Sequence, residues 1–281
     1  MIFRALTLGI ALASLLPWRV AAHGDLHEQI RAVTEQIAKD PKNSELYFKR
    51  GELHRAHQEW DEAQADYDQA LALNPGLTMI DFTRGRMLLE ANWPHSAKIC
   101  LDRFLRKHTN HVEGFTARAR TLVKLEKPLD AARDFTTAIR YAPTGRPELY
   151  IERAQALASA GEKHYQESLR GLDEGIEKLG PLVTLQLHAI DIELKRKKFD
   201  AALGRLDTVA AQSPRKETWL ARRGEILQLA GRKAEARTAY LDALQALDSL
   251  PPARRNVPAM AELKRRITAA LEIVGPVSSP N

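Results

Sequence analysis

The chain has 281 residues, of which 28% are charged, and its formal net charge is +6. Acidic and basic side chains alternate along the sequence, so this modest charge gives no reason to expect nucleic-acid binding. Cys100 is the only cysteine, which excludes an intramolecular disulfide. We therefore expect the fold to be stabilised by the packing of apolar side chains, with Cys100 as one of them.

The first 22 residues have the order of a secretory signal peptide. Arg4 is followed by an apolar run from Ala5 to Leu16, and the segment ends with the small residues Val20-Ala21-Ala22. This order predicts export, with cleavage after Ala22. The apolar run is too short to cross a bilayer comfortably, although retention as an uncleaved anchor is the alternative. We expect a periplasmic or secreted protein with no stable membrane span after cleavage.

The next stretch, 23–42, predicts a single amphipathic helix. It ends at Asp40-Pro41, and a proline at that point prevents the helix from continuing. Its apolar residues recur at helical spacing and share one face. They are Leu26, Ile30, Val33 and Ile37.

Residues 43–76 predict two short amphipathic helices joined by a tight turn. The small residues Gly51 and Ala63 allow the two helices to approach closely, Tyr67 fills the remaining space, and Pro75 ends the second helix. The pattern recurs along the chain. With Ala63 as the reference position, equivalent residues follow at spacings of 34, 34, 37, 34 and 34 residues. They are Ala97, Ala131, Ser168, Ala202 and Ala236.

A last amphipathic helix is predicted at Pro258–Val274. Proline near the start and Gly275 just past the end bracket it as expected for a helix. Its apolar residues lie on one face: Met260, Leu263, Ile267, Leu271 and Val274.

The repeated unit resembles the tetratricopeptide repeat (TPR), a 34-residue helix-turn-helix. The resemblance implies an all-α TPR solenoid, a right-handed superhelix of repeats closed at both ends by capping helices that cover the end repeats. Since the sequence shows no linker, we expect one continuous solenoid domain. The implied segments are a signal peptide at 1–22, an N-terminal capping helix at 23–42, six repeats at 43–76, 77–110, 111–145, 146–181, 182–215 and 216–253, a C-terminal capping helix at 254–274 and a disordered tail at 275–281.

An arginine precedes the small helix-contact position in five of the six repeats. Asp66 and Asp134 stand at matching places in two second helices. We predict that these arginines form ion pairs within their own repeats; a basic ligand-binding surface is the alternative. The arginines are Arg50, Arg84, Arg118, Arg153 and Arg223.

The TPR resemblance also implies a function. In this family the first helices of the repeats line a concave groove that binds a peptide or helix from another protein, so we expect a scaffold or adaptor. Apolar groove residues should be exposed when the groove is empty, unless the superhelix curls and buries some of them. Arg86 and Arg120, opposed by Glu52 and Asp191, would set the charge preference. The groove positions carried over by register are Phe48, Glu52, Met79, Phe82, Arg86, Thr116, Arg120, Ile151, Gln155, Leu187 and Asp191.

No catalytic constellation emerges from the sequence. It contains no HExxH or CxxC motif and no phosphate-binding loop, and the serines have no partner histidine and acid that the periodicity would bring together. We therefore expect a protein that is not an enzyme and that has no cofactor.

Pairs of closely spaced histidines could bind a metal ion. His54 and His57 flank a turn and are interpreted as polar turn residues. If cleavage makes His23 the N-terminus, its amine and imidazole, with His27 four residues later, could bind Cu(II), so copper handling is an alternative function. Beyond this pair we expect no metal site. Self-assembly into a homo-oligomer is the remaining alternative.

Overall fold

The structure is a computed structural model that describes residues 18–275, with side chains from residue 25 onward. All elements within this range are helical, as the periodicity predicts. The chain divides into two compact units, an N-terminal unit (Met1–Lys107) and a C-terminal unit (His108–Asn281). The sequence, which shows no linker, led us to expect one continuous domain and gave no sign of this division. Because repeats in an array contact only their neighbours, a compact unit can end between any two of them.

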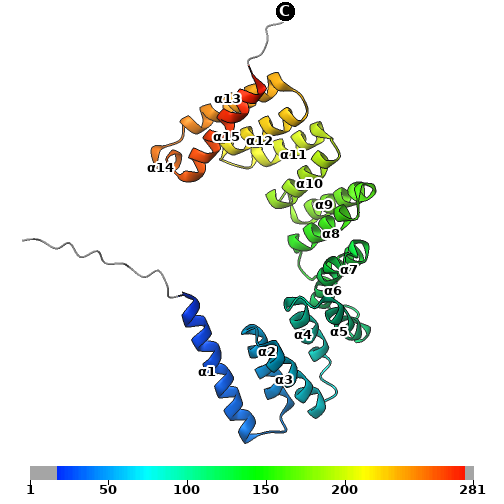
Figure 1. The fold of residues 1–281 in the computed structure, drawn as a ribbon. Helices are drawn as coiled ribbons and strands as arrows, with labels where there is room; N and C mark the ends of the chain where they lie inside the picture. The colour runs from blue at the N-terminus through cyan, green and yellow to red at the C-terminus, as the bar shows by residue number, and fades with distance from the viewer. Residues whose placement is uncertain (1–17, 276–281) are drawn as a thin grey trace, which may run out of the picture. The chain divides into compact units, whose positions relative to one another are not determined.

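The N-terminal unit contains two helix pairs and one further helix. α2 (Ser44–Ala56) pairs with α3 (Trp60–Leu73), and α4 (Met79–Glu90) pairs with α5 (Pro94–Lys107). α1 (Trp18–Lys39) packs against α2, as seen at the blue end of the ribbon in Figure 1. Val33 and Ile37 of α1 are buried in this contact layer, in keeping with the predicted apolar stripe.

The C-terminal unit repeats the same pairing. α6 pairs with α7, α8 with α9, α10 with α11, and α12 with α13, while α15 packs against α13 and α12 (Figure 1). α15 covers the stretch for which the apolar periodicity predicts the last helix. The bounds are α6 (Val112–Lys124), α7 (Pro128–Tyr141), α8 (Pro147–Ser159), the 3₁₀ turn η1 (Glu162–His164), α9 (Tyr165–Leu179), α10 (Val183–Lys195), α11 (Phe199–Ala211), α12 (Lys216–Leu229), α13 (Lys233–Asp248), α14 (Pro252–Arg255) and α15 (Pro258–Val274).

The reference positions of the repeat lie where the two helices of each pair touch. All six have no exposed surface, from Ala63 in α3 to Ala236 in α13. The facing position in the first helix is equally tight: a Cβ added at Gly51 would lie 2.8 Å from the Tyr67 ring, and one added at Gly224 would lie 2.5 Å from the Tyr240 ring. Close backbone approach is thus what the small residues provide. Cys100 is buried, and burial raises the pKa of its thiol.

A left-handed residue ends the first helix of each repeat. In the first repeat, Gln58 has φ 65°, and the following Glu59 N–H donates to His54 O at 2.9 Å. This six-to-one hydrogen bond is that of a Schellman motif, which satisfies carbonyl groups at the end of the helix. Four of these six left-handed residues are not glycine, so the sequence predicts a tight turn but does not indicate its left-handed position. The residues are Gln58, Asn92, Glu126, Gly161, Lys197 and Gly231.

The predicted ends of the chain fall mostly outside the described residues. The apolar run Ala5–Leu16 and the tail after Gly275 lie beyond them, so the signal peptide and the disordered tail remain predictions. α1 begins at Trp18, upstream of the expected cleavage point after Ala22. Among the described residues, no helix combines the length and apolar character that crossing a membrane requires.

Candidate functional site

Three of the five arginines that precede the small helix-contact positions form the predicted ion pair within their own repeat, and the other two pair with the preceding repeat. Arg118 donates to both carboxylate oxygens of Asp134, at 2.7 and 2.8 Å, from α6 to α7. Arg153 of α8 has no aspartate partner in α9. It donates instead to Glu174 at 2.6 Å and to the Gly171 carbonyl at 3.0 Å. Since all five guanidinium groups are paired with acidic residues of neighbouring helices, they do not form a basic ligand-binding surface. Arg50 pairs with Asp66 within the first repeat, whereas Arg84 pairs with Asp68 and Arg223 with Asp207, each in the second helix of the preceding repeat.

In each unit we call the first helices of the repeats the first-helix face of that unit: α2 and α4 in the N-terminal unit, and α6, α8, α10 and α12 in the C-terminal unit. In the N-terminal unit, Met79 is 39% exposed, and Phe48 is half-buried with its ring centroid 6.3 Å from that of Tyr67. Phe82 is only 6% exposed and packs on Phe104 of α5, with ring centroids 5.3 Å apart. The expectation that Phe82 lies in solvent is therefore wrong.

Charged residues of the N-terminal first-helix face are bound to one another. Glu52 accepts hydrogen bonds from Arg55 and from the Tyr67 hydroxyl. Arg55 also donates to both oxygens of Glu90 on α4, at 2.9 and 2.8 Å. Burial lowers the pKa of Arg55, but its bonds to these two carboxylates outweigh burial, and the net shift is upward. Arg86 lies 3.9 Å from Glu90, and its guanidinium covers the Phe82 ring at 5.5 Å.

The candidate residues of the C-terminal unit differ in exposure. Thr116 is buried, and its hydroxyl donates to the Val112 carbonyl at 2.9 Å, so it is part of the helix packing rather than an open binding position. Ile151 and Leu187 are half-buried and pack against the apolar core. Gln155 of α8 is exposed. The apolar residues of this unit that were expected in solvent are thus partly covered, as Phe48 is in the N-terminal unit.

Ion pairs also join the first helices of successive repeats in the C-terminal unit. Arg120 of α6 donates to both oxygens of Glu152 on α8, at 2.7 and 2.6 Å. Asp191 of α10 accepts from Arg222 of α12 at 3.3 Å. Arg120 and Asp191, which we expected to face a ligand in the groove, are thus paired with residues of the neighbouring repeat. Arg55 and Glu90 form a pair of the same kind. Their sequence separation of 31 to 35 residues, close to one repeat, was a signal that could have identified them.

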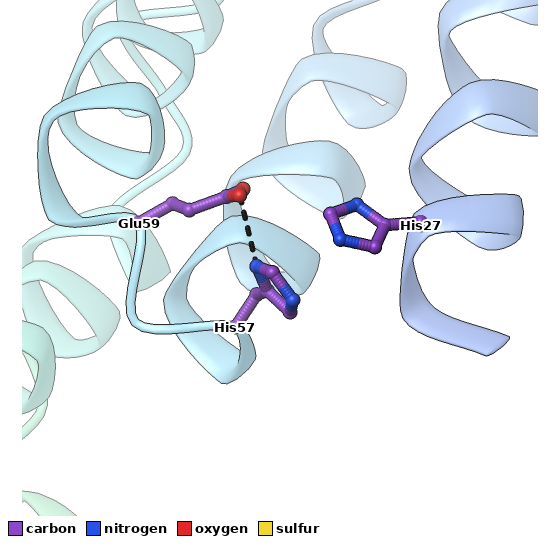
Figure 2. A group of neighbouring side chains, drawn as sticks. All are labelled: His27, His57 and Glu59. Atoms are coloured by element: carbon purple, nitrogen blue, oxygen red, sulfur yellow. Dashed lines mark hydrogen bonds and ion pairs between the residues drawn. The ribbon is translucent and has the colours of Figure 1, made fainter. Parts of the chain in front are cut away.

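A cluster of imidazole and carboxylate groups lies where α1 meets the first repeat. Figure 2 shows His27 on α1 facing His57, which ends α2, and Glu59, which precedes α3. The two imidazole centroids are 4.3 Å apart, and His57 Nδ1 lies 2.8 Å from Glu59 Oε1. His54, expected with His57 to be an ordinary turn residue, is 2.6 Å from the other oxygen of Glu59. The side chain of His23 lies outside the described residues.

Family models recognise the repeats along much of the chain. Residues 44–77 and 116–164 match models of the tetratricopeptide repeat, and residues 153–260 match the model of a tetratricopeptide repeat-like domain. The chain carries tetratricopeptide repeats. Together with the helix pairs and the small buried contact positions, this identifies the fold as that of a TPR solenoid.

Known proteins similar to this TPR chain agree on the fold. The C-terminal part of a TPR repeat-containing protein from Cytophaga hutchinsonii superposes with a TM-score of 0.65 at 16% identity, over 83% of this chain and 97% of that structure. YrrB, described as a TPR protein with an unusual peptide-binding site, has a TM-score of 0.54 at 22% identity, over 66% of this chain and 94% of its own. At such low sequence identities, these similarities show a shared fold and nothing about a shared function.

One curated relative is an enzyme by name. Protein O-mannosyl-transferase Tmtc3 from Drosophila melanogaster is 23% identical over 162 residues, which is 55% of this chain. The match spans only 18% of the length of that protein. The activity in its name therefore says nothing about the present TPR chain, whose repeats are of a kind that generally serves as a non-catalytic scaffold.

Proposed function

We propose that this protein is a non-catalytic TPR scaffold that binds a segment of another protein on the first-helix face of its N-terminal unit. The observation that carries the proposal is the exposure of Met79 at the start of α4, on a face that the TPR family uses for binding. Phe48 on α2 is half-buried, so part of its ring is accessible to a partner. Apolar side chains of this kind are typical anchors for a bound peptide.

The ion pairs of the N-terminal first-helix face support a preorganised surface. Arg55 joins α2 to α4 through Glu90, and Glu52 is held by both Arg55 and Tyr67. Side chains already fixed in this way lose little conformational freedom when a partner binds. Arg86 has 40% of its side chain exposed. A partner segment with an apolar anchor for Met79 and a carboxylate for Arg86 would match the chemistry of this face.

We also propose that the protein is exported. The support is the order of residues 1–22, in which one basic residue, a short apolar run and a small-residue ending follow one another. N-terminal sequencing of the protein recovered from outside the cytoplasm tests this proposal, which predicts His23 as the first residue. A chain recovered intact from Met1 would contradict cleavage.

The binding proposal is tested by affinity capture with matched variants. The baits are the wild-type protein, a Met79→Ala/Arg86→Ala variant and an Ile99→Ala control; Ile99 is 61% exposed on α5, the second helix of its repeat. We expect a protein that binds to wild type and control but not to the double variant. Phe82→Ala is unsuitable because Phe82 is part of the core.

Two outcomes would contradict the binding proposal. A partner retained equally by all three baits would place the binding surface elsewhere. A partner lost with Ile99→Ala but kept by the double variant would move it to the second helices. Sedimentation of the purified protein separates these outcomes from self-assembly, in which the captured protein is a second copy of the same chain.

A further inference from the structure

His27, His57 and Glu59 can offer one ligand atom each to a single metal ion. Their imidazole nitrogens and carboxylate oxygen all lie within 4.8 Å of one another (Figure 2). We propose that they form a binding site for a divalent transition metal, best suited to Zn²⁺, that fastens α1 to the first repeat. The site is independent of the proposed scaffold function.

The distances are compatible with zinc after small side-chain movements. In a tetrahedral site with metal–ligand bonds of about 2.1 Å, ligand atoms are about 3.4 Å apart. His57 Nδ1 and Glu59 Oε1 are already 2.8 Å apart, so the metal would replace the hydrogen bond between them. His27 is exposed on α1, and rotation of its side chain can bring a ring nitrogen closer. A water molecule would complete the fourth position.

The backbone places His57 and Glu59 on the same side of the turn. Gln58 between them has φ 65°, which reverses the chain at the end of α2. The turn is held by hydrogen bonds from His57 N–H to Leu53 O at 3.0 Å and from Glu59 N–H to His54 O at 2.9 Å. Both side chains are therefore displayed toward α1 by a rigid turn, and little ordering is needed for them to bind a metal.

The ligand residues are peculiar to the first repeat. A left-handed residue also ends the first helix of every other repeat, but no other pair of residues flanking it is a histidine and a carboxylate. TPR architecture therefore needs neither His57 nor Glu59 at these positions. The corresponding flanking pairs are Ala91 and Trp93, Leu125 and Lys127, Ala160 and Glu162, Arg196 and Lys198, and Ala230 and Arg232.

A second layer of contacts orients the carboxylate. His54 Nδ1 lies 2.6 Å from Glu59 Oε2, which leaves Oε1 directed at His57. His54 Nε2 is in turn 3.8 Å from Asp66 Oδ2, and Asp66 is fixed by Arg50. His54 thus holds one carboxylate oxygen of Glu59 and leaves the other to a metal. Partners of this kind orient the ligands in known metal sites.

The donor set selects the class of metal. Two imidazoles and one carboxylate suit zinc and its neighbours, whereas Ca²⁺ and Mg²⁺ prefer oxygen ligands throughout. The site also differs from the copper site that a free His23 amine would provide, because its ligands come from two parts of the folded unit, α1 and the turn between α2 and α3. Zn²⁺ binding should therefore not require cleavage of the chain before His23.

The test is titration of Zn²⁺ into the full chain, without a polyhistidine tag, against a chromophoric chelator. We expect one equivalent to bind, and at least about tenfold weaker binding in His27→Gln and in His57→Gln. His95→Gln is the matched control, since His95 is exposed at the start of α5, and its affinity should equal that of wild type. Zn²⁺ should also slow hydrogen exchange of the α1 amides in wild type and control only.

Three outcomes would overturn the metal site, and a fourth would contradict the fastening of α1. The first is the absence of stoichiometric Zn²⁺ binding to a chain that circular dichroism shows to be folded. The second is binding that both His27→Gln and His57→Gln leave intact. The third is binding that appears only when the chain begins at His23, which would assign the metal to the terminal amine. Loss of binding with His57→Gln alone, with α1 exchange unchanged by metal, would contradict the fastening of α1.

Discussion

Arg50 of α2 and Asp66 of α3 form a two-point ion pair within the first repeat. Arg50 Nε donates to Asp66 Oδ2 at 2.8 Å, and Nη2 donates to Oδ1 at 2.7 Å. The Asp66 side chain is only 5% exposed, whereas that of Arg50 is 21% exposed. The hydrogen bonds to Asp66 raise the pKa of Arg50 despite its partial burial. Arg118 joins the two helices of the third repeat in the same way through Asp134.

Removal of Arg50 should destabilise the N-terminal unit more than removal of a surface arginine. Arg50→Met keeps the apolar stem but leaves the Asp66 carboxylate buried without its partner, and we expect a loss of about 2–3 kcal/mol. Arg133→Met is the control, because Arg133 is 77% exposed and pairs with the exposed Asp130, a contact that should contribute less than about 0.5 kcal/mol. Urea denaturation followed by circular dichroism measures both. Equal losses of unfolding free energy in the two variants would show that the buried ion pair stabilises the fold no more than the exposed one.

The close helix approach at Gly224 gives a second prediction. A methyl group added there would lie 2.5 Å from the Tyr240 ring, so Gly224→Ala should force α12 and α13 apart and cost about 1–3 kcal/mol. Gly204 of α11 is the matched control, since its added Cβ would meet nothing within 4 Å. Gly204→Ala should stabilise the protein by about 0.5–1 kcal/mol through helix propensity. Thermal unfolding shows whether each variant is more or less stable than wild type. A change in the same direction for both variants would contradict the packing explanation.

The helix pairs could be predicted from the sequence because they depend on local periodicity. The small and aromatic positions, such as Gly51 and Tyr67, specify which faces of two adjacent helices meet, and the intra-repeat pair of Arg118 with Asp134 follows from the same register. The small buried positions recur in every repeat, so one correct assignment extends to the others. The Arg–Asp pair within a repeat occurs only in the first and third repeats.

The details of the candidate sites could not be predicted in the same way. Burial of Phe82 depends on how α4 is rotated against Phe104 of α5, which the repeat register does not define. The meeting of His27 with His57 and Glu59 depends on the packing of α1 against α2, a contact between an atypical end helix and the first repeat. The division of the chain into two units also lacks a compositional signal.

The left-handed turn residues supply a third prediction. Glu126 adopts φ 57° after α6, a conformation that is unfavourable for a residue with a Cβ. Glu126→Gly should therefore stabilise the C-terminal unit by about 0.5–1 kcal/mol, since relief of strain exceeds the extra flexibility of glycine in the unfolded chain. Gly231→Ala introduces the reverse change at the equivalent turn, where φ is 75°, and should destabilise by a similar amount. Denaturation midpoints that move in the same direction for both variants would contradict this account.

Tyr240 should make the stability of the C-terminal unit fall at alkaline pH. Burial, aided by the nearby Glu225 carboxylate and opposed by Arg266, raises the pKa of Tyr240 to about 12, whereas an unfolded tyrosine titrates near about 10. Between these values only the unfolded chain releases the proton. The contribution of Tyr240 to the free energy of unfolding is thus complete below pH about 10. It declines by about 1.4 kcal/mol per pH unit as the pH rises toward about 12.

Comparison of wild type with Tyr240→Phe isolates this contribution. The variant loses the hydroxyl and its hydrogen bond to Gln228 Oε1, which is 2.8 Å long, so it should be less stable than wild type below pH 9. Its stability should then fall less steeply above pH 10, because other groups that titrate in this range are common to both proteins. Urea denaturation at intervals from pH 9 to pH 11.5 gives the two slopes. Parallel curves would mean that the buried Tyr240 hydroxyl ionises as readily in the folded protein as in the unfolded chain.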